Sequence, residues 1–206
     1  MQLHRRVFES LYRRAANPES LPWHREEPPR LLQGLLAKRE VGRALDLGCG
    51  EGVLATYLAE RGWSVVGVDF VPAALNLAER RAESAGVQVE LVQADVLGWE
   101  SPGAFDLVLD SGCLHHIYGE NRKRYRARLN EWLAKDGDYV LVHFGKRHRW
   151  DWRPVGPSRL SRQKLIDFFD ELHPHGYEET YYELPFPMGP RALAGVYWFR
   201  HDRHDP

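Results

Sequence analysis

Short apolar runs alternate along the chain with longer amphipathic segments, and this alternation predicts the fold. Five runs are rich in β-branched residues and bounded by Gly, Asp or Pro, as strands are. They cover residues 43–47, 64–70, 87–93, 105–111 and 138–144. Between them, residues 52–62, 72–86 and 121–137 carry apolar residues at helical spacing and stop at glycine. The pattern therefore predicts strands alternating with helices.

Strands that alternate with helices of this length predict right-handed βαβ units, and near-continuous apolar strands indicate a sheet covered on both faces. We expect a single α/β domain over residues 1–206, with a Rossmann-like, doubly wound, mostly parallel seven-stranded sheet. A helix at 161–172, with Ser161 as N-cap, would precede an antiparallel C-terminal hairpin formed by residues 177–184 and 192–200. N-terminal helices are expected at 2–15 and 28–39.

Composition narrows the class of protein. The chain has 206 residues, of which 43% are hydrophobic and 28% charged, a balance typical of soluble globular domains. It has no apolar run of transmembrane length and no signal-peptide pattern, so we expect a cytoplasmic protein without a membrane partner. A net charge of −1 argues against a protein dedicated to binding nucleic acid. The basic run at 122–128 is interpreted as a solvated helix face rather than an RNA-binding patch.

A glycine-rich turn follows the first expected strand, in the stretch "ALDLGCGEG". Gly48, Gly50 and Gly52 allow the backbone to turn sharply and a ligand to approach it closely. Asp69 ends the second strand, where an acid can accept both ribose hydroxyls. In a parallel sheet such a ligand binds beyond the carboxyl ends of the strands. The third glycine comes one residue too early for the nicotinamide fingerprint G-x-G-x-x-G, which argues against a dinucleotide.

Together, D-x-G-x-G-x-G, the acid ending the second strand and a third acid in "QADV" after the third strand carry a family resemblance. From about residue 43 to 144 the chain resembles the class I S-adenosylmethionine-dependent methyltransferases, and its C-terminal hairpin resembles their terminal strand pair. The resemblance implies S-adenosylmethionine as cofactor and S-adenosylhomocysteine as product. It divides the chain into N-terminal helices and lid (1–42), cofactor-binding core (43–144) and a substrate-side segment with the terminal hairpin (145–206).

The resemblance also implies which residues bind the cofactor. Asp46, Gly48, Cys49, Gly50 and Gly52 would border its methionine part, Asp69 would bind the ribose, Phe70 would flank the adenine, and Asp95 and the Val96 amide would meet the adenine edge. Trp23 resembles the lid tryptophan of thiopurine-type and tellurite-resistance-type methyltransferases, where a ring face against a sulfonium is favourable.

The stretch "DSGCLHHIYG", residues 110–119, concentrates an acid, a thiol and two imidazoles after the fourth strand. A metal site lacks paired ligands at the usual spacing, so no metal is expected. A nucleophilic Cys113 lacks an orienting third group. We favour a loop that walls off the reacting methyl group, because in-line transfer needs alignment and exclusion of water.

In that interpretation Asp110, Ser111 and Gly112 surround the methionine tail, and His115 and His116 are the candidate catalytic residues. Further candidates for binding the acceptor are His143, a secondary base, together with Trp150, Trp152 and Arg153 in the long segment after the fifth strand.

We expect a methyltransferase acting on a small molecule, at a thiol, another chalcogen or an aromatic hydroxyl. Two alternatives stay open: an RNA or protein methyltransferase, and a non-catalytic protein that binds S-adenosylmethionine. The Asn/Asp-Pro-Pro-aromatic motif of base-methylating enzymes is missing after the fourth strand, which counts against nucleic acid. The oligomeric state, monomer or homodimer, is left open.

Overall fold

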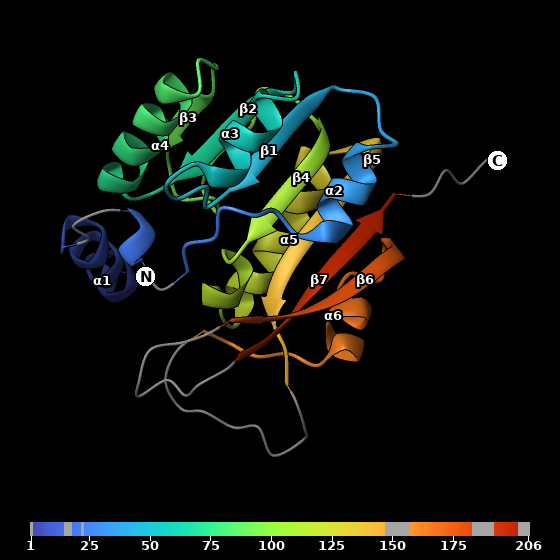
Figure 1. The fold of residues 1–206 in the computed structure, drawn as a ribbon. Coiled ribbons are helices and arrows are strands. Elements are labelled where there is room, and N and C mark those ends of the chain that lie inside the picture. Colours follow the sequence, from blue (N-terminus) through green and yellow to red (C-terminus); the bar gives the residue numbers. More distant parts are fainter. Residues whose placement is uncertain (1, 15–17, 22, 147–156, 183–191, 202–206) are drawn as a thin grey trace.

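The computed structural model describes residues 2–14, 18–21, 23–146, 157–182 and 192–201. Its seven strands form one sheet in the order β3-β2-β1-β4-β5-β7-β6 (Figure 1). They are β1 Arg43–Leu47, β2 Ser64–Asp69, β3 Glu90–Gln93, β4 Phe105–Ser111, β5 Leu133–Phe144, β6 His173–Tyr182 and β7 Ala192–Arg200. The first five strands are parallel, and β7 runs antiparallel between β5 and β6. The predicted fold class is confirmed.

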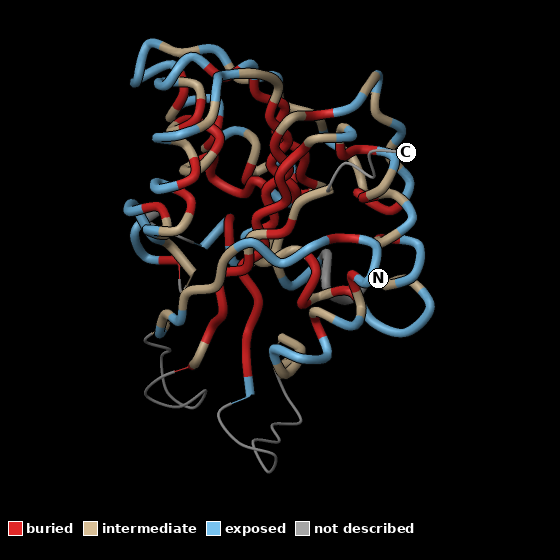
Figure 2. Tube along the Cα trace, turned by 90° about the vertical axis from the view of Figure 1, so that its right-hand side faces the viewer, coloured by how far each residue is buried: buried red, intermediate tan, exposed pale blue. Residues whose placement is uncertain are grey.

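Helices cover both faces of the sheet. The helices are α1 Gln2–Arg14, α2 Arg30–Leu36, α3 Val53–Ala59, α4 Pro72–Ser84, α5 Glu120–Trp132 and α6 Arg162–Phe168, with 3-10 turns η1 Pro18–Ser20 and η2 Leu114–His116. One apolar cluster joins α2 and α3 to the sheet, and another joins α5 and α6 to its opposite face. Figure 2 shows the buried positions concentrated along the strands between these layers. Within the described residues, no helix is long and apolar enough to span a membrane.

The largest differences from the predicted helix boundaries lie at the C-terminal ends of α5 and α6. The helix expected at 121–137 ends at Trp132, and the chain enters β5 at Leu133. Leu133 pairs with Phe105 of β4, with a register shift before Leu107, so cross-strand pairing overrides the helical spacing of this segment. The helix expected at 161–172 ends at Phe168 because β6 already begins at His173. Its predicted N-cap is confirmed: the Ser161 hydroxyl accepts a hydrogen bond from the Lys164 N–H (3.4 Å).

The strand order places the candidate site. The order reverses between β1 and β4, and ligands of open α/β sheets bind at the carboxyl ends of the strands flanking such a point. Here Leu47 of β1 lies opposite Val68 of β2 and Asp110 of β4. The fold therefore gathers the glycine-rich turn, the acid ending β2 and the start of the 110–119 stretch at one edge of the sheet.

Candidate functional site

The turn between β1 and α3 is built for close approach of a ligand. Gly48, Gly50 and Gly52 have φ values of +66°, +56° and +76°, in the left-handed region that side chains disfavour. The Gly48 and Cys49 N–H groups both donate to the Val68 carbonyl (2.7 and 3.1 Å), which ties the turn to β2. The Cys49 side chain is buried, so Cys49 offers a ligand mainly its backbone. All four predicted loop residues lie together at this turn.

Buried carboxyl groups surround the turn. Asp69 is 7% exposed and accepts hydrogen bonds from the Gly50 N–H (3.0 Å) and the Val71 N–H (2.8 Å), which joins the end of β2 to the glycine-rich turn. Burial, reinforced by the nearby Asp110 and Asp69, raises the pKa of Asp46 to about 7. Within the described chain no Lys or Arg forms an ion pair with Asp46, Asp69 or Asp110. This negative environment suits a cationic ligand.

The residues after β3 continue the same edge. The Ala94 N–H donates to the Asp69 carbonyl (3.1 Å), so the chain leaving β3 is fixed beside β2. Asp95 is half-buried and accepts from the Leu97 N–H (3.0 Å), while Val96 is buried. Phe70, which follows β2, is half-buried, and the contact of these residues with an adenine ring stays a prediction.

Asp110 shapes the loop that leaves β4. Its carboxylate is 1% exposed and accepts hydrogen bonds from the backbone N–H groups of residues 112–114 and from the Tyr125 hydroxyl (2.6 Å). With its oxygens occupied, Asp110 acts on a ligand through the loop conformation. The next residue, Ser111, is exposed, and Gly112 has a φ of +117°. These two remain the candidates for direct contact.

Three histidines lie close together beyond β4 and β5. The His115 ring lies 4.5 Å from His116, 5.8 Å from His143 and 4.9 Å from Phe144, measured between ring centroids. Burial lowers the pKa of His115 well below its usual value and that of His143 to about 4, so both imidazoles are neutral near pH 7. His143 Nδ1 donates to the Phe144 carbonyl (2.9 Å). His143 Nε2 and His115 Nδ1 are buried without a hydrogen-bond partner in the described chain. Because His143 Nδ1 is the donor, its Nε2 carries the free lone pair of that ring.

The other two interpretations of this stretch gain no support from its geometry. Burial, together with the nearby Asp110 carboxylate, raises the pKa of the Cys113 thiol well above its usual value, which leaves it protonated and a poor nucleophile. Among the described residues, no group of three or more His, Cys, Asp or Glu side chains is placed to hold a metal ion.

An aromatic lid covers the glycine-rich turn. Trp23 lies edge-on to Phe8 (5.5 Å) and Tyr12 (5.6 Å) of α1, measured between ring centroids. An added Cβ on Gly50 would lie 2.7 Å from the Tyr12 hydroxyl, so α1 sits directly on the turn. Phe8 also contacts the His116 ring (4.9 Å), linking the lid to the loop after β4. Trp23 therefore packs with the α1 aromatics beside the glycine-rich turn, and its contact with a cofactor stays a prediction.

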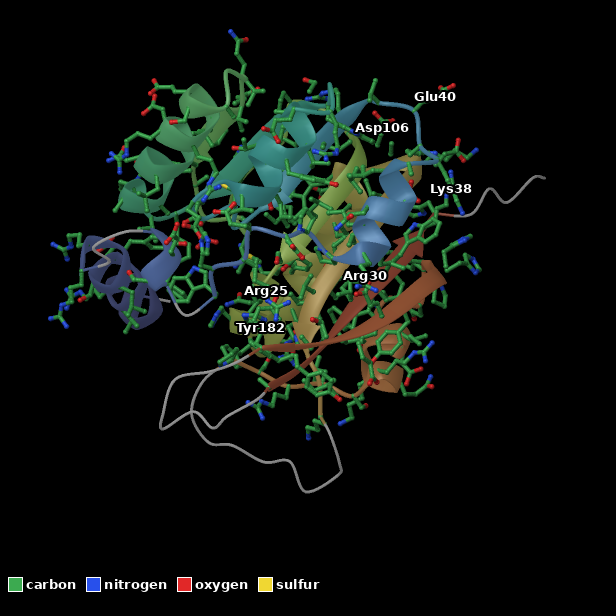
Figure 3. All side chains as sticks on the ribbon, in the orientation of Figure 1. Arg25, Arg30, Lys38, Glu40, Asp106 and Tyr182 are labelled. Carbon is green, nitrogen blue, oxygen red and sulfur yellow. The ribbon has the colours of Figure 1, made fainter. Side chains whose placement is uncertain are left out.

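Several residues at the site escaped the sequence analysis. Phe8 and Tyr12 carried a usable signal, since two aromatics four residues apart share one helix face. Glu51, inside the glycine-rich turn, and Arg25 and Tyr182, which stack together beside the lid (Figure 3), carried no local signal. The predicted acceptor contacts at positions 150, 152 and 153 lie outside the described residues.

Comparisons with known proteins agree with this geometry. A family model described as a methyltransferase domain matches residues 44–137. The chain is 35% identical over 147 residues to the 2-heptyl-1-hydroxyquinolin-4(1H)-one methyltransferase of Mycobacteroides abscessus, covering 68% of this chain and 64% of that protein. It is 33% identical over 110 residues to an uncharacterised methyltransferase of Schizosaccharomyces pombe, covering 53% of this chain and 76% of that one.

A solved structure concerned with the conversion of a disulfide bond into a thioacetal group during echinomycin biosynthesis superimposes with a TM-score of 0.71. It is 26% identical and covers 98% of this chain and 94% of the other. The chain spans 43% to 64% of the length of five curated relatives that it matches.

Proposed function

The chain belongs to the class I S-adenosylmethionine-dependent methyltransferases, and we propose that it transfers the donor's methyl group to a small-molecule acceptor. The observation that carries the proposal is the cradle at the switch point of the sheet. There a turn of three left-handed glycines is surrounded by the buried carboxyl groups of Asp46 and Asp69, which have no paired Lys or Arg in the described chain.

The charge of this cradle distinguishes the donor from other nucleoside ligands. A dinucleotide or nucleoside phosphate would bring negative charge among carboxyl groups whose pKa burial already raises. S-adenosylmethionine carries a sulfonium and an ammonium group, so it supplies the missing positive charge. Asp69 at the end of β2 would accept the ribose hydroxyls, and the half-buried Phe70 and Asp95 would flank the base.

When bound, the donor supplies an electrophilic methyl group, and the protein aligns and encloses it. The lid formed by Phe8, Tyr12 and Trp23 excludes water from the glycine-rich turn, and the loop after β4 closes the opposite side. Alignment without water lowers the barrier of an in-line displacement by several kcal/mol. If the acceptor is a hydroxyl, its proton must leave, and the candidates to take it are His115, which is neutral near pH 7, and His116.

Among acceptor classes, an aromatic or heteroaromatic hydroxyl comes first. It is supported by the identity to a relative named for a hydroxylated quinolone. It is also supported by a row of aromatic rings, in which Phe144 lies 4.9 Å from His115 and Tyr182 lies 5.4 Å from Phe144, measured between ring centroids. A thiol or other chalcogen is the second choice, because it ionises without the help of a base.

The structure gives little support to an RNA acceptor. Cations of the basic run on α5 are engaged within the protein: Arg126 with Asp170 (2.8 Å), Arg128 with Glu131 (2.7 Å) and Lys123 with Glu120 (3.0 Å). A run whose charges are already paired offers few free cations to phosphates.

The test combines binding with turnover. Calorimetry with S-adenosylhomocysteine should show binding, and labelled S-adenosylmethionine should transfer methyl to at least one member of a panel of phenols, hydroxyquinolones and thiols. Failure to bind donor or product at millimolar concentration would refute the proposal. Binding without turnover on the panel, on RNA or on protein would favour the non-catalytic alternative, and transfer confined to RNA or protein would refute the small-molecule acceptor.

A further inference from the structure

Four consecutive residues, 23–26, each contact a different part of the molecule, and we call this segment the strap. Trp23 contacts α1, His24 the glycine-rich turn, Arg25 the strand β6 and Glu26 the helix α4. Figure 3 shows Arg25 reaching from the N-terminal segment to Tyr182 at the end of β6. The strap therefore spans the two halves of the site, donor and acceptor.

On the donor side, the strap is attached to the glycine-rich turn itself. His24 Nδ1 lies 2.7 Å from Glu51 Oε1, and the two side chains are only 11% and 6% exposed. Glu51 lies between the second and third glycines, so a ligand that settles the backbone of the turn also settles the Glu51 carboxylate. Because this bond is nearly buried, its loss is not compensated by water.

On the acceptor side, Arg25 holds the end of β6. Its guanidinium stacks 3.8 Å from the centroid of the Tyr182 ring and donates to the Thr180 hydroxyl (3.1 Å) and the Tyr181 carbonyl. The Tyr182 ring in turn lies 5.4 Å from that of Phe144, where β5 ends, measured between ring centroids. Arg25 and Tyr182 therefore stand at the carboxyl ends of the strands that adjoin the His115 loop.

We propose that Arg25 and Tyr182 are acceptor-positioning residues, and that the His24–Glu51 contact sets their position when the donor binds. This inference rests on the proposed function. A guanidinium with N–H donors to spare beside an aromatic ring suits a planar acceptor with an ionised oxygen. His24 and Arg25 are adjacent, so a shift of the glycine-rich turn reaches β6 through one peptide unit and the side chains of Glu51, His24 and Arg25.

The remaining strap contact defines a different role. Glu26 forms a two-pronged pair with Arg81 of α4 (2.8 and 2.9 Å), on an exposed surface. Glu26 Oε1 also lies 3.2 Å from His24 Nε2, so this pair tethers both the lid and His24 to α4. If the whole strap were a tether, donor binding would stabilise the lid without any effect on β6.

Hydrogen exchange measured by mass spectrometry on the full chain separates the two roles, with S-adenosylhomocysteine as the probe. In the unsubstituted protein we expect exchange to slow both in the glycine-rich turn and, by at least about fivefold, in residues 177–182. Arg25→Gln and His24→Phe should keep the slowing in the turn and reduce that in 177–182 to less than about twofold. His24→Asn, which keeps an N–H donor near Glu51, should restore it.

The matched control is Arg162→Gln. Arg162 of α6 also stacks on a tyrosine of β6, Tyr177 (4.2 Å), but it does not belong to the strap, so this variant should behave like the unsubstituted protein. Slowing in 177–182 that survives both Arg25→Gln and His24→Phe would overturn the proposal, as would a protected turn with an unprotected β6 in the unsubstituted protein. An unprotected turn would instead refute donor binding itself. Circular dichroism confirms folding, and two independent strap variants keep the test decisive if one fails to fold.

Discussion

Gly50→Ala tests the contact between the lid and the glycine-rich turn most directly. The added Cβ would lie 2.7 Å from the Tyr12 hydroxyl oxygen, against a lower limit of 3.4 Å for ordinary contact, so Tyr12 must retreat by about 0.7 Å. Tyr12 is 8% exposed and held by Trp23, so it cannot move without disturbing the lid. We expect the substitution both to destabilise the fold and to weaken binding of S-adenosylhomocysteine.

The magnitude has two parts that a control can separate. Placing alanine at a φ of +56° costs about 1 kcal/mol, and displacing a packed side chain adds about 2 kcal/mol. Gly86→Ala isolates the first part, because Gly86 has a φ of +68° and an added Cβ there meets nothing within 4 Å. Both substitutions lose similar backbone freedom in the unfolded state, so that effect cancels in the comparison.

A double-mutant cycle with Tyr12→Phe completes the test. Once the hydroxyl is removed, the nearest ring carbon, Cζ, lies 3.9 Å from the added Cβ, so the overlap disappears. Urea unfolding should show Gly50→Ala costing about 3 kcal/mol alone and about 1 kcal/mol in the Tyr12→Phe background, a coupling of about 2 kcal/mol. If Gly50→Ala costs no more than Gly86→Ala, or the same in both backgrounds, the reasoning about the lid is wrong.

Three further predictions concern the donor and the chemistry. The affinity for S-adenosylmethionine should rise about tenfold from pH 6 to pH 8. The cationic donor favours the ionised form of Asp46, whose pKa is about 7, so below that pH binding must first release the proton from the Asp46 carboxyl group. Asp46→Asn should flatten this pH dependence of the affinity, measured by calorimetry. Asp69→Ala should weaken binding about 10- to 100-fold through loss of charge-assisted hydrogen bonds, and an unchanged dissociation constant would contradict its assignment. If His115 removes the acceptor's proton, His115→Ala should lower kcat and abolish the acidic limb of the pH–rate profile, whereas a residue that only walls the site would leave the shape of that profile unchanged.

Much of the fold and of the donor cradle could be predicted from the sequence because the relevant signals are local. β-Branched runs and helical spacing mark each element within a few residues, and left-handed turns select glycine at positions 48, 50 and 52. Asp69 ends β2 and Asp46 is the last residue but one of β1, so parallel order alone brings them to one edge. These features depend on the chain nearby and on one general rule of sheet topology.

Features that depend on contacts between residues far apart in the sequence could be seen only in the tertiary structure. The start of β5 at Leu133 came from pairing with Phe105, against the helical pattern of its own segment. His115 is neutral because it is buried, and the spacing of residues in the sequence does not predict that burial. Arg25 meets Thr180 across 155 positions of sequence. Such contacts leave no periodic trace, because either partner alone is an ordinary polar side chain, and only packing decides which ones meet.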